Sequence, residues 1–326
     1  MSWSIRDWTF DENGPGGYSR IFSQGNRIRK VCIIGRRNPD VAENYAIQTN
    51  WGPTGFQSYK LGLVHYISCM TKSKVDDEVQ VQRDVACRCS EQYGKSVVPI
   101  VFRAEYLEDV DPRTYGFNVY HLKEGPHAGY QEVEGTRNVY RELTRVNLYF
   151  IEMERIESMS KGLSRSYNKR MFANLDAATA LHARTVVLFL ADLGYLHNDY
   201  HLNNFIMEGK FEASVPQHVR CYAIDFSNAR RLTREETAHY RSLATVNQKV
   251  EFLKHLSPAT FKKEGVQIYK WLWQKEPSAS MAEVTVDSSD VIPIDEMLRY
   301  FPETRCEEEY TKNEVYICRK KTLVKV

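Results

Sequence analysis

The pattern of hydrophobic and polar positions changes about halfway along this 326-residue chain. In the first half, short runs rich in β-branched or aromatic residues occur at 27–34, 97–102 and 148–151, and pieces containing glycine or proline separate them. Such runs predict strands, and the intervening pieces predict turns. The first half therefore favours a sheet of three or more strands.

Helical spacing occurs once in the first half and repeatedly in the second. Residues 75–90 place Val75, Val79, Gln82 and Ala86 at steps of three and four and contain no glycine or proline, which predicts a helix. Residues 176–194 show a stronger apolar repeat, and Gly194 suits the left-handed residue that ends many helices. Further helices are expected at 235–256 and 267–273. The composition of residues 275–289 predicts a surface loop, and the charged residues after 306 predict a solvated tail.

This order of elements predicts an α+β protein with two lobes. We expect a β-rich lobe over residues 1–156 and a mainly helical lobe over residues 157–326. The hydrophobic fraction of 42% and the charged fraction of 26% are ordinary for a globular protein of this length.

Charge and cysteine content narrow the choice of partners and compartment. Lys and Arg number 44 against 42 acidic residues, so the net charge of +2 gives no clear signal for nucleic acid or a membrane surface. Seven cysteines without zinc-ligand spacing favour reduced thiols. No apolar run is long enough for a leader or a membrane span. We therefore expect an intracellular location, cytoplasmic or nuclear.

The candidate chemistry lies just after the strongest helical pattern. His197, Asp199, His201 and Asn204 fall within eight residues, and Asp225 follows a short apolar run at 221–224. In phosphoryl transfer one Asp orients the acceptor hydroxyl, while an Asn and a second Asp hold the magnesium that neutralises the phosphates of ATP. The spacing of acid, amide and acid indicates this chemistry.

These residues match the pattern H-x-D-x-[KH]-x-x-N, and Asp225-Phe226-Ser227 matches the metal-binding DFG triad except at its glycine. On these motifs the chain resembles the protein kinase-like superfamily between residues 14 and 227. The resemblance implies that Asp199 and His201 are catalytic and that Asn204 and Asp225 bind Mg2+. A purely structural role for His201, as a hydrogen-bonding residue of the loop, stays open.

The resemblance extends to the first lobe. Residues 14–21 resemble the glycine-rich hairpin that covers the nucleotide, and an ordinary Gly-Pro turn is the alternative. The resemblance implies ATP-binding roles for Gly14, Gly16, Tyr18 and Ile21. Lys30, on a strand joined to that hairpin by a turn at 24–26, would hold the phosphates, with Arg29 and Arg36 as competitors. A solvated edge-strand lysine is the structural alternative.

A helical glutamate and a hinge complete the expected set. Glu78, with Asp77 as runner-up, would position Lys30; a charge at a helix start also has a purely structural explanation. Met153 would be the gatekeeper, with Glu154 to Ile156 as the hinge that pairs with adenine. An apolar strand followed by charged residues explains that segment equally well.

Several features depart from the family pattern. Ser19 and Ser227 replace glycines of the pattern, and Ser227 implies a less switchable triad at Asp225. The long interval from Asn204 to Asp225 implies an extended hairpin around 209–218, and no Ala-Pro-Glu follows. In style the chain is similar to the divergent kinases of large DNA viruses, for which the location would be host cytoplasm or the virion.

We therefore expect an ATP-dependent phosphotransferase that uses Mg2+ and acts on Ser or Thr of a protein substrate. Two alternatives stay open. A small-molecule kinase of the same fold would use the same residues on a different acceptor, and a pseudokinase would serve as a binding module without turnover.

Overall fold

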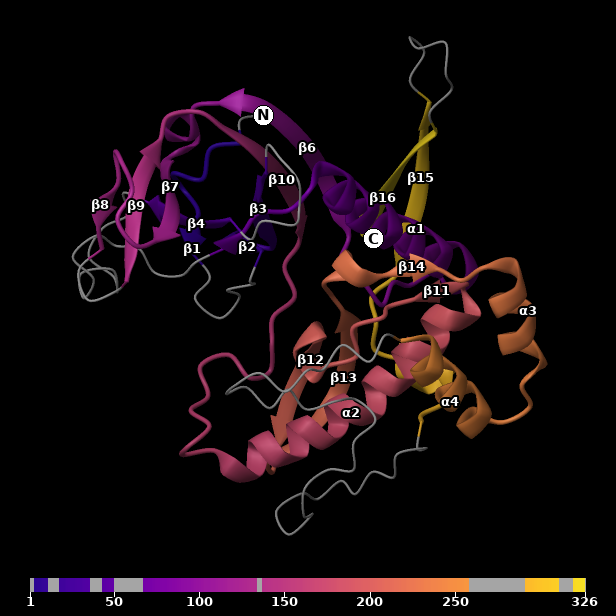
Figure 1. The fold of residues 1–326 in the computed structure, drawn as a ribbon. Helices are drawn as coiled ribbons and strands as arrows, with labels where there is room; N and C mark the ends of the chain where they lie inside the picture. The colour runs from indigo at the N-terminus through magenta and orange to yellow at the C-terminus, as the bar shows by residue number, and fades with distance from the viewer. Residues whose placement is uncertain are drawn as a thin grey trace. The chain divides into compact units, whose positions relative to one another are not determined.

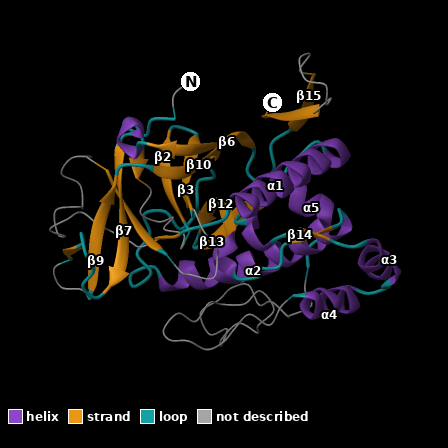
Figure 2. Cartoon of the chain, turned by 45° about the horizontal axis from the view of Figure 1, so that its top comes forward, coloured by secondary structure: helices purple, strands orange, loops and turns teal. Residues whose placement is uncertain are grey.

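A computed structural model describes residues 3–10, 18–35, 43–49, 67–133, 137–257, 291–310 and 319–325. The chain forms two compact units: Met1–Val79 with Val101–Arg155, and Gln80–Ile100 with Ile156–Val326. The first unit is rich in strands and the second carries most of the helices, so the expected α+β class is confirmed (Figures 1 and 2). The division differs from the expected 156/157 boundary because helix α1 (Lys72–Tyr93) contributes residues to both units.

The main sheet of the first unit has five strands in the order β1-β2-β3-β10-β6, and every pairing is antiparallel. Its strands are β1 (Thr9–Phe10), β2 (Ser19–Gln24), β3 (Arg27–Ile34), β6 (Val101–Val110) and β10 (Val146–Glu154). β3 has its expected bounds, and Gly25 takes the positive φ of 56° needed by the turn before it. The strand expected from residue 97 begins only at Val101; Pro99, just before it, has no N–H to donate to a ladder.

A second sheet, which the sequence pattern did not reveal, packs on the first. It has the order β5-β4-β7-β9-β8, from β4 (Asn44–Thr49), β5 (Ile67–Ser68), β7 (Phe117–Glu124), β8 (Gln131–Glu132) and β9 (Asn138–Leu143). One hydrophobic core joins Ile33 and Phe150 of the main sheet to Ile47 and Val119 of the second, with Trp3 from the N-terminal segment. The core covers one face of the main sheet, so the opposite face is the one that α1 meets.

The second unit is built on helix α2 (Lys169–Asp192), which packs against the hairpin of β12 (Phe205–Glu212) and β13 (Val215–Ala223). α2 begins seven residues earlier than the expected start at 176, and Gly194 follows it with φ 89°. The hairpin confirms the expected insertion at 209–218. The remaining elements are β11 (Tyr195–Leu196), β14 (Arg230–Arg231), α3 (Arg234–Ser242), α4 (Val246–Leu256), α5 (Ile294–Leu298), β15 (Thr304–Tyr310) and β16 (Arg319–Lys325).

Two expectations for the second half need correction. The single helix expected at 235–256 is two helices, because Thr245 forms a capping box with Gln248 that starts α4. The C-terminal tail is an antiparallel backbone hairpin of β15 and β16. The helix expected at 267–273 and the loop expected at 275–289 lie outside the described residues.

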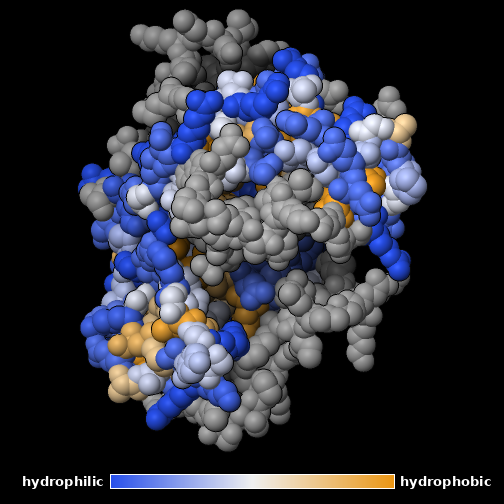
Figure 3. Space-filling view, turned by 90° about the vertical axis from the view of Figure 1, so that its left-hand side faces the viewer, coloured by the Kyte–Doolittle hydropathy of each residue, from blue (hydrophilic) through white to orange (hydrophobic). Residues whose placement is uncertain are grey.

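The surface of the described residues is mainly polar. Hydrophilic residues cover most of the described part of the face in Figure 3. Among the described residues, the large hydrophobic side chains with substantial exposure are Tyr18, Tyr167 and Tyr300. None of the helices that the structure describes combines the length and apolar character of a membrane span.

Candidate active site

A buried histidine fixes the start of the candidate catalytic loop in the second unit. His197 is 1% exposed, and its Nε2–H donates to the carbonyl of Ile224 at 2.9 Å. Its ring lies against Phe205 and Phe226, with centroid distances of 5.7 and 5.0 Å. Burial lowers the pKa of His197, outweighing the neighbouring carboxylates, so the neutral ring is favoured. His197 therefore ties the loop to the chain just before Asp225.

The β12–β13 hairpin brings Asn204 and Asp225 to the same end of the ladder. Asn204 directly precedes β12, Asp225 follows β13, and Phe205 pairs with Ala223. The amide of Ile224 donates to the carbonyl of Asn204 at 2.9 Å, which closes the base of the hairpin. Residues 21 apart in sequence are thus neighbours at one edge, as a shared metal would require.

Backbone conformation sets the direction of both loop segments. Asp225 has φ 59° and ψ 73°, and Asn198 has φ 66°. Asn and Asp tolerate this left-handed region better than other residues with a Cβ, which pay about 1–2 kcal/mol. Such conformations cluster at functional sites. Ser227, where the family pattern has glycine, lies in a 3-10 turn at Phe226–Asn228 and has no positive φ.

Asp199 is held between two side chains. Its Oδ1 lies 3.5 Å from Nε2 of His201, and its Oδ2 accepts from Nδ2 of Asn228 at 3.4 Å. Burial acts to raise the pKa of Asp199, but the hydrogen bond and charge of His201, with help from His197 and Asn204, lower it overall. The carboxylate is ionised at neutral pH. Asn228 was not identified from the sequence, since only its position three residues after Asp225 could have suggested it.

The amide of Asn204 is oriented by the same loop. Nδ2 donates to the carbonyl of Asp199 at 3.2 Å, and the residue is 4% exposed. The amide oxygen is then the atom left to meet a cation, at the end of the hairpin to which Asp225 also belongs. Carboxylate and amide oxygens suit Mg2+, which completes its shell with water and phosphate oxygens. Within the described residues, no group of three or more His, Cys, Asp or Glu is placed to hold a metal ion.

A buried ion pair dominates the candidate site of the first unit. Nζ of Lys30 lies 2.6 Å from Oε1 of Glu78, with side-chain exposures of 11% and 2%. The residues are 48 apart in sequence and meet because Val75 and Val79 of α1 pack on the face of the sheet that carries Lys30. Asp77, the runner-up, is exposed. The pair expected from the sequence is therefore present.

The other expected nucleotide-binding residues of this unit lie around Lys30. Ile21 pairs with Lys30 across β2 and β3, and Met153 is buried in the cluster that faces α1. Tyr18, just before β2, is 47% exposed. Gly14 and Gly16 lie outside the described residues.

The hinge segment begins at the end of β10. Glu154 is the last residue of that strand and pairs with Arg27, and Ile156 follows two residues later. The amide of Arg155 donates to the carbonyl of Asn26 at 2.9 Å. The amide of Arg155 is therefore already engaged by the turn between β2 and β3.

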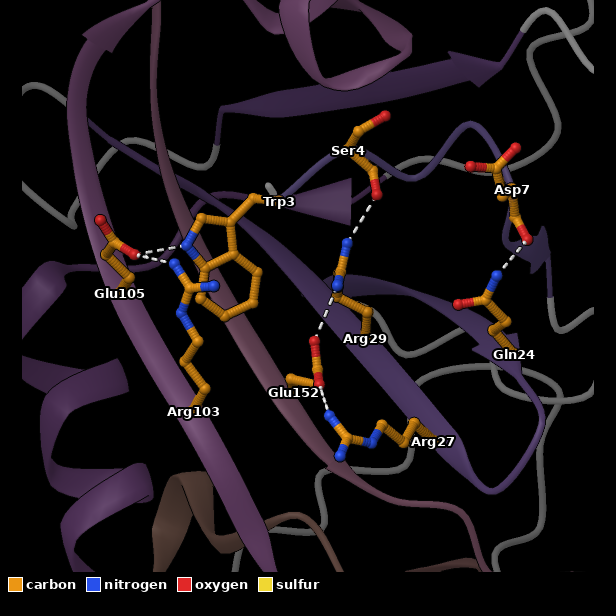
Figure 4. A network of polar contacts seen from close by, with 9 residues as sticks. All are labelled: Trp3, Ser4, Asp7, Gln24, Arg27, Arg29, Arg103, Glu105 and Glu152. Carbon is orange, nitrogen blue, oxygen red and sulfur yellow. Dashed lines mark hydrogen bonds and ion pairs between the residues drawn. The ribbon is translucent and has the colours of Figure 1, made fainter. Parts of the chain in front are cut away.

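A polar network on the opposite face of the main sheet was not anticipated. Glu152 accepts from Arg27 at 2.5 Å and from Arg29 at 2.7 Å (Figure 4). Arg29 also lies over the rings of Trp8 and Trp3. The alternation of Arg27 and Arg29 with apolar neighbours could have indicated it. This network binds the N-terminal segment to the strands that carry Lys30 and Met153.

A second unanticipated group lies in the second unit. Asp84 of α1 accepts from Arg231 of β14 and from the hydroxyl of Tyr195 at 3.2 Å, and Arg88 lies over the Tyr195 ring. These contacts join α1 to the segment that follows Asp225. No sequence signal links residues so far apart.

Comparison with protein-family models gave no match, and comparison with curated proteins gave none. Solved structures do match. Rio2 kinase from Chaetomium thermophilum, in an ADP/Mg2+-phosphoaspartate complex, is 13% identical over 81% of this chain, with a TM-score of 0.32. The chain spans 60% of that Rio2 chain. WaaP in complex with acyl carrier protein is 13% identical over 76% of each chain, with a TM-score of 0.27.

Titin kinase with its flanking domains is 12% identical over 69% of this chain and 50% of its own, with a TM-score of 0.19. Scores this low do not establish a shared fold. The functional interpretation therefore rests on the geometry within the two units.

Proposed function

We propose that this protein is an ATP-dependent phosphotransferase of the protein kinase-like type, which transfers the γ-phosphoryl group of Mg-ATP to a hydroxyl. The observation that carries the proposal is the buried pair of Lys30 and Glu78. A solvated lysine on an edge strand would have no reason to meet a buried helix carboxylate, whereas kinases need that pair to position phosphates. The acceptor that we favour is Ser or Thr of a protein.

The second unit supplies the groups that such a transfer requires. Asp199, ionised and held by His201 and Asn228, would orient the acceptor hydroxyl and take its proton. Asn204 and Asp225 would hold Mg2+ by their oxygens, and the ion would neutralise charge on the phosphates. His201, when protonated, would offset charge on the transferring group.

The remaining expected residues would bind the rest of the nucleotide. Lys30 would contact the phosphates, with Ile21 against the adenine and Tyr18 covering the site. Met153 and the backbone of Glu154 and Ile156 would border the base. These roles are part of the proposal, as are an intracellular site of action and the likeness to kinases of large DNA viruses.

A small hydroxylated compound is the second candidate acceptor, because no Ala-Pro-Glu follows Ser227 to end a peptide-binding segment. A pseudokinase is the third candidate, since Ser19 and Ser227 replace glycines. Retention of Lys30, Asp199, Asn204 and Asp225 argues for turnover, because a scaffold has no chemical need for all four.

The test is a thermal shift with Mg-ATP followed by turnover with protein and small-molecule acceptors. A ligand at 100 times its dissociation constant stabilises the fold by about 2.7 kcal/mol, so binding at millimolar nucleotide gives a clear shift. Asp199→Asn should keep the shift and lose turnover. Absence of a shift in the wild-type chain would contradict the proposal, and a shift without turnover on any acceptor would favour the pseudokinase.

A further inference from the structure

A second lysine lies beside the Lys30–Glu78 pair. Lys74 is one turn before Glu78 on α1, so the two side chains share a face of the helix. Its Nζ lies over the ring of Tyr18, 5.4 Å from the centroid. Lys74 is half-buried, and its neighbour Val75 packs on the sheet face that carries Lys30. The ammonium is therefore held at the start of β2, inside the first unit.

Lys74 differs from the neighbouring lysines in its partners. Lys72 pairs with Asp76 at 2.5 Å, and Lys30 pairs with Glu78. No carboxylate among the described residues forms an ion pair with Lys74, whose ammonium contacts only an aromatic face. A ring face offers a cation about 0.5–2 kcal/mol, and hydrogen bonds between two charged groups are the stronger kind. An anionic ligand would supply what this position lacks.

The strand register places this cation near Lys30. Ser19 pairs with Cys32, two residues along β3 from Lys30, and Tyr18 directly precedes Ser19. Two residues of a strand span about 6.6 Å. Lys30, through its pair with Glu78, and Lys74, one turn before Glu78 on α1, both lie on the side of the sheet that α1 covers.

We propose that Lys74 is a second phosphate-contacting lysine, which binds the polyphosphate of a nucleoside triphosphate together with Lys30. The inference rests on the proposed function and adds a residue to it. Tyr18 holds the ammonium in place when no nucleotide is bound, and the flexible lysine stem lets it exchange the ring for a phosphate oxygen. Glu78 is committed to Lys30 and cannot neutralise both cations.

The experiment compares Mg-ATP and adenosine binding by calorimetry in the full chain with Lys74→Met, Lys74→Arg and Lys72→Met. Lys74→Met should raise the Kd for Mg-ATP about tenfold, as expected for a lost charge-assisted hydrogen bond, and leave the Kd for adenosine unchanged. Lys74→Arg should restore most of the affinity. Lys72→Met, two residues earlier on α1 at an exposed side chain, should match the wild type for both ligands.

Two results separate the inference from the function on which it rests. Wild-type affinity for Mg-ATP in Lys74→Met would overturn the inference and leave the proposed function standing. An equal loss of Mg-ATP and adenosine binding would also overturn it, because that pattern indicates a structural role. If the wild-type chain binds no Mg-ATP, the proposed function and the inference fail together.

Discussion

The buried pair of Lys30 and Glu78 allows a quantitative test by a double-mutant cycle. With exposures of 11% and 2%, both charges are largely removed from water. Removing one partner of such a pair leaves the other charge uncompensated, at a cost of about 3–5 kcal/mol, whereas replacing both by apolar residues is often nearly neutral. We expect Lys30→Met and Glu78→Leu each to lower the free energy of unfolding by about that amount. The double variant should lose less than either.

Urea unfolding at neutral pH, followed by circular dichroism, measures the four corners of the cycle. The exposed pair of Lys161 and Glu157 gives a matched control, because its charged atoms lie 2.8 Å apart and its side chains are 51% and 52% exposed. Its cycle should show a coupling of at most about 0.5 kcal/mol. Mg-ATP should stabilise the control variants as it does the wild type, and should not stabilise any variant that lacks Lys30.

The outcome that refutes the reasoning is additivity. If the two single losses are each below about 1 kcal/mol and sum to that of the double variant, the carboxylate and ammonium are not coupled, and the pair does not position Lys30. A large coupling without any effect on nucleotide binding would make the pair purely structural.

Three further predictions concern other parts of the two units. Burial lowers the pKa of His197 below its unfolded value of about 6.5, so the folded state favours the neutral ring. The stability is therefore full above a pH of about 6.5 and decreases as the pH falls from there towards the folded pKa. Urea unfolding at pH 7.5 and 5.5 should show a loss that His197→Asn reduces, and an unchanged loss would contradict it. Asp225→Asn keeps a side chain that tolerates the left-handed backbone, so it should unfold like the wild type yet lose the Mg-ATP thermal shift; a retained shift would remove Asp225 from the metal site. Arg29→Met should lower the free energy of unfolding by about 3 kcal/mol, because it leaves Glu152 buried with one partner. Arg27→Met, at a side chain that is 45% exposed, should lower it by less than about 1 kcal/mol. Equal losses in urea unfolding would show that burial does not decide the difference.

Local pattern was sufficient for elements whose residues are close in sequence. The strand at Arg27–Ile34, the β12–β13 hairpin and the left-handed Gly194 after α2 follow from alternation, turn residues and helical spacing. The second sheet was missed because β4 and β7 are separated by 67 residues and neither carries a turn signal that links it to the other. Strand pairing of this kind depends on the shared core, which local pattern does not contain.

The residues of the candidate site could likewise be predicted only in part from the sequence. The sequence by itself determined which residues could carry the chemistry, since Asp199, Asn204 and Asp225 follow a spacing that phosphoryl transfer requires. Only the tertiary structure decided that Glu78, and not Asp77, meets Lys30, because one position on the helix is buried against the sheet and the next is exposed. It also placed Lys74 on Tyr18. The sequence specifies the type of each side chain. Packing between distant segments decides which charged groups are buried and therefore need a partner.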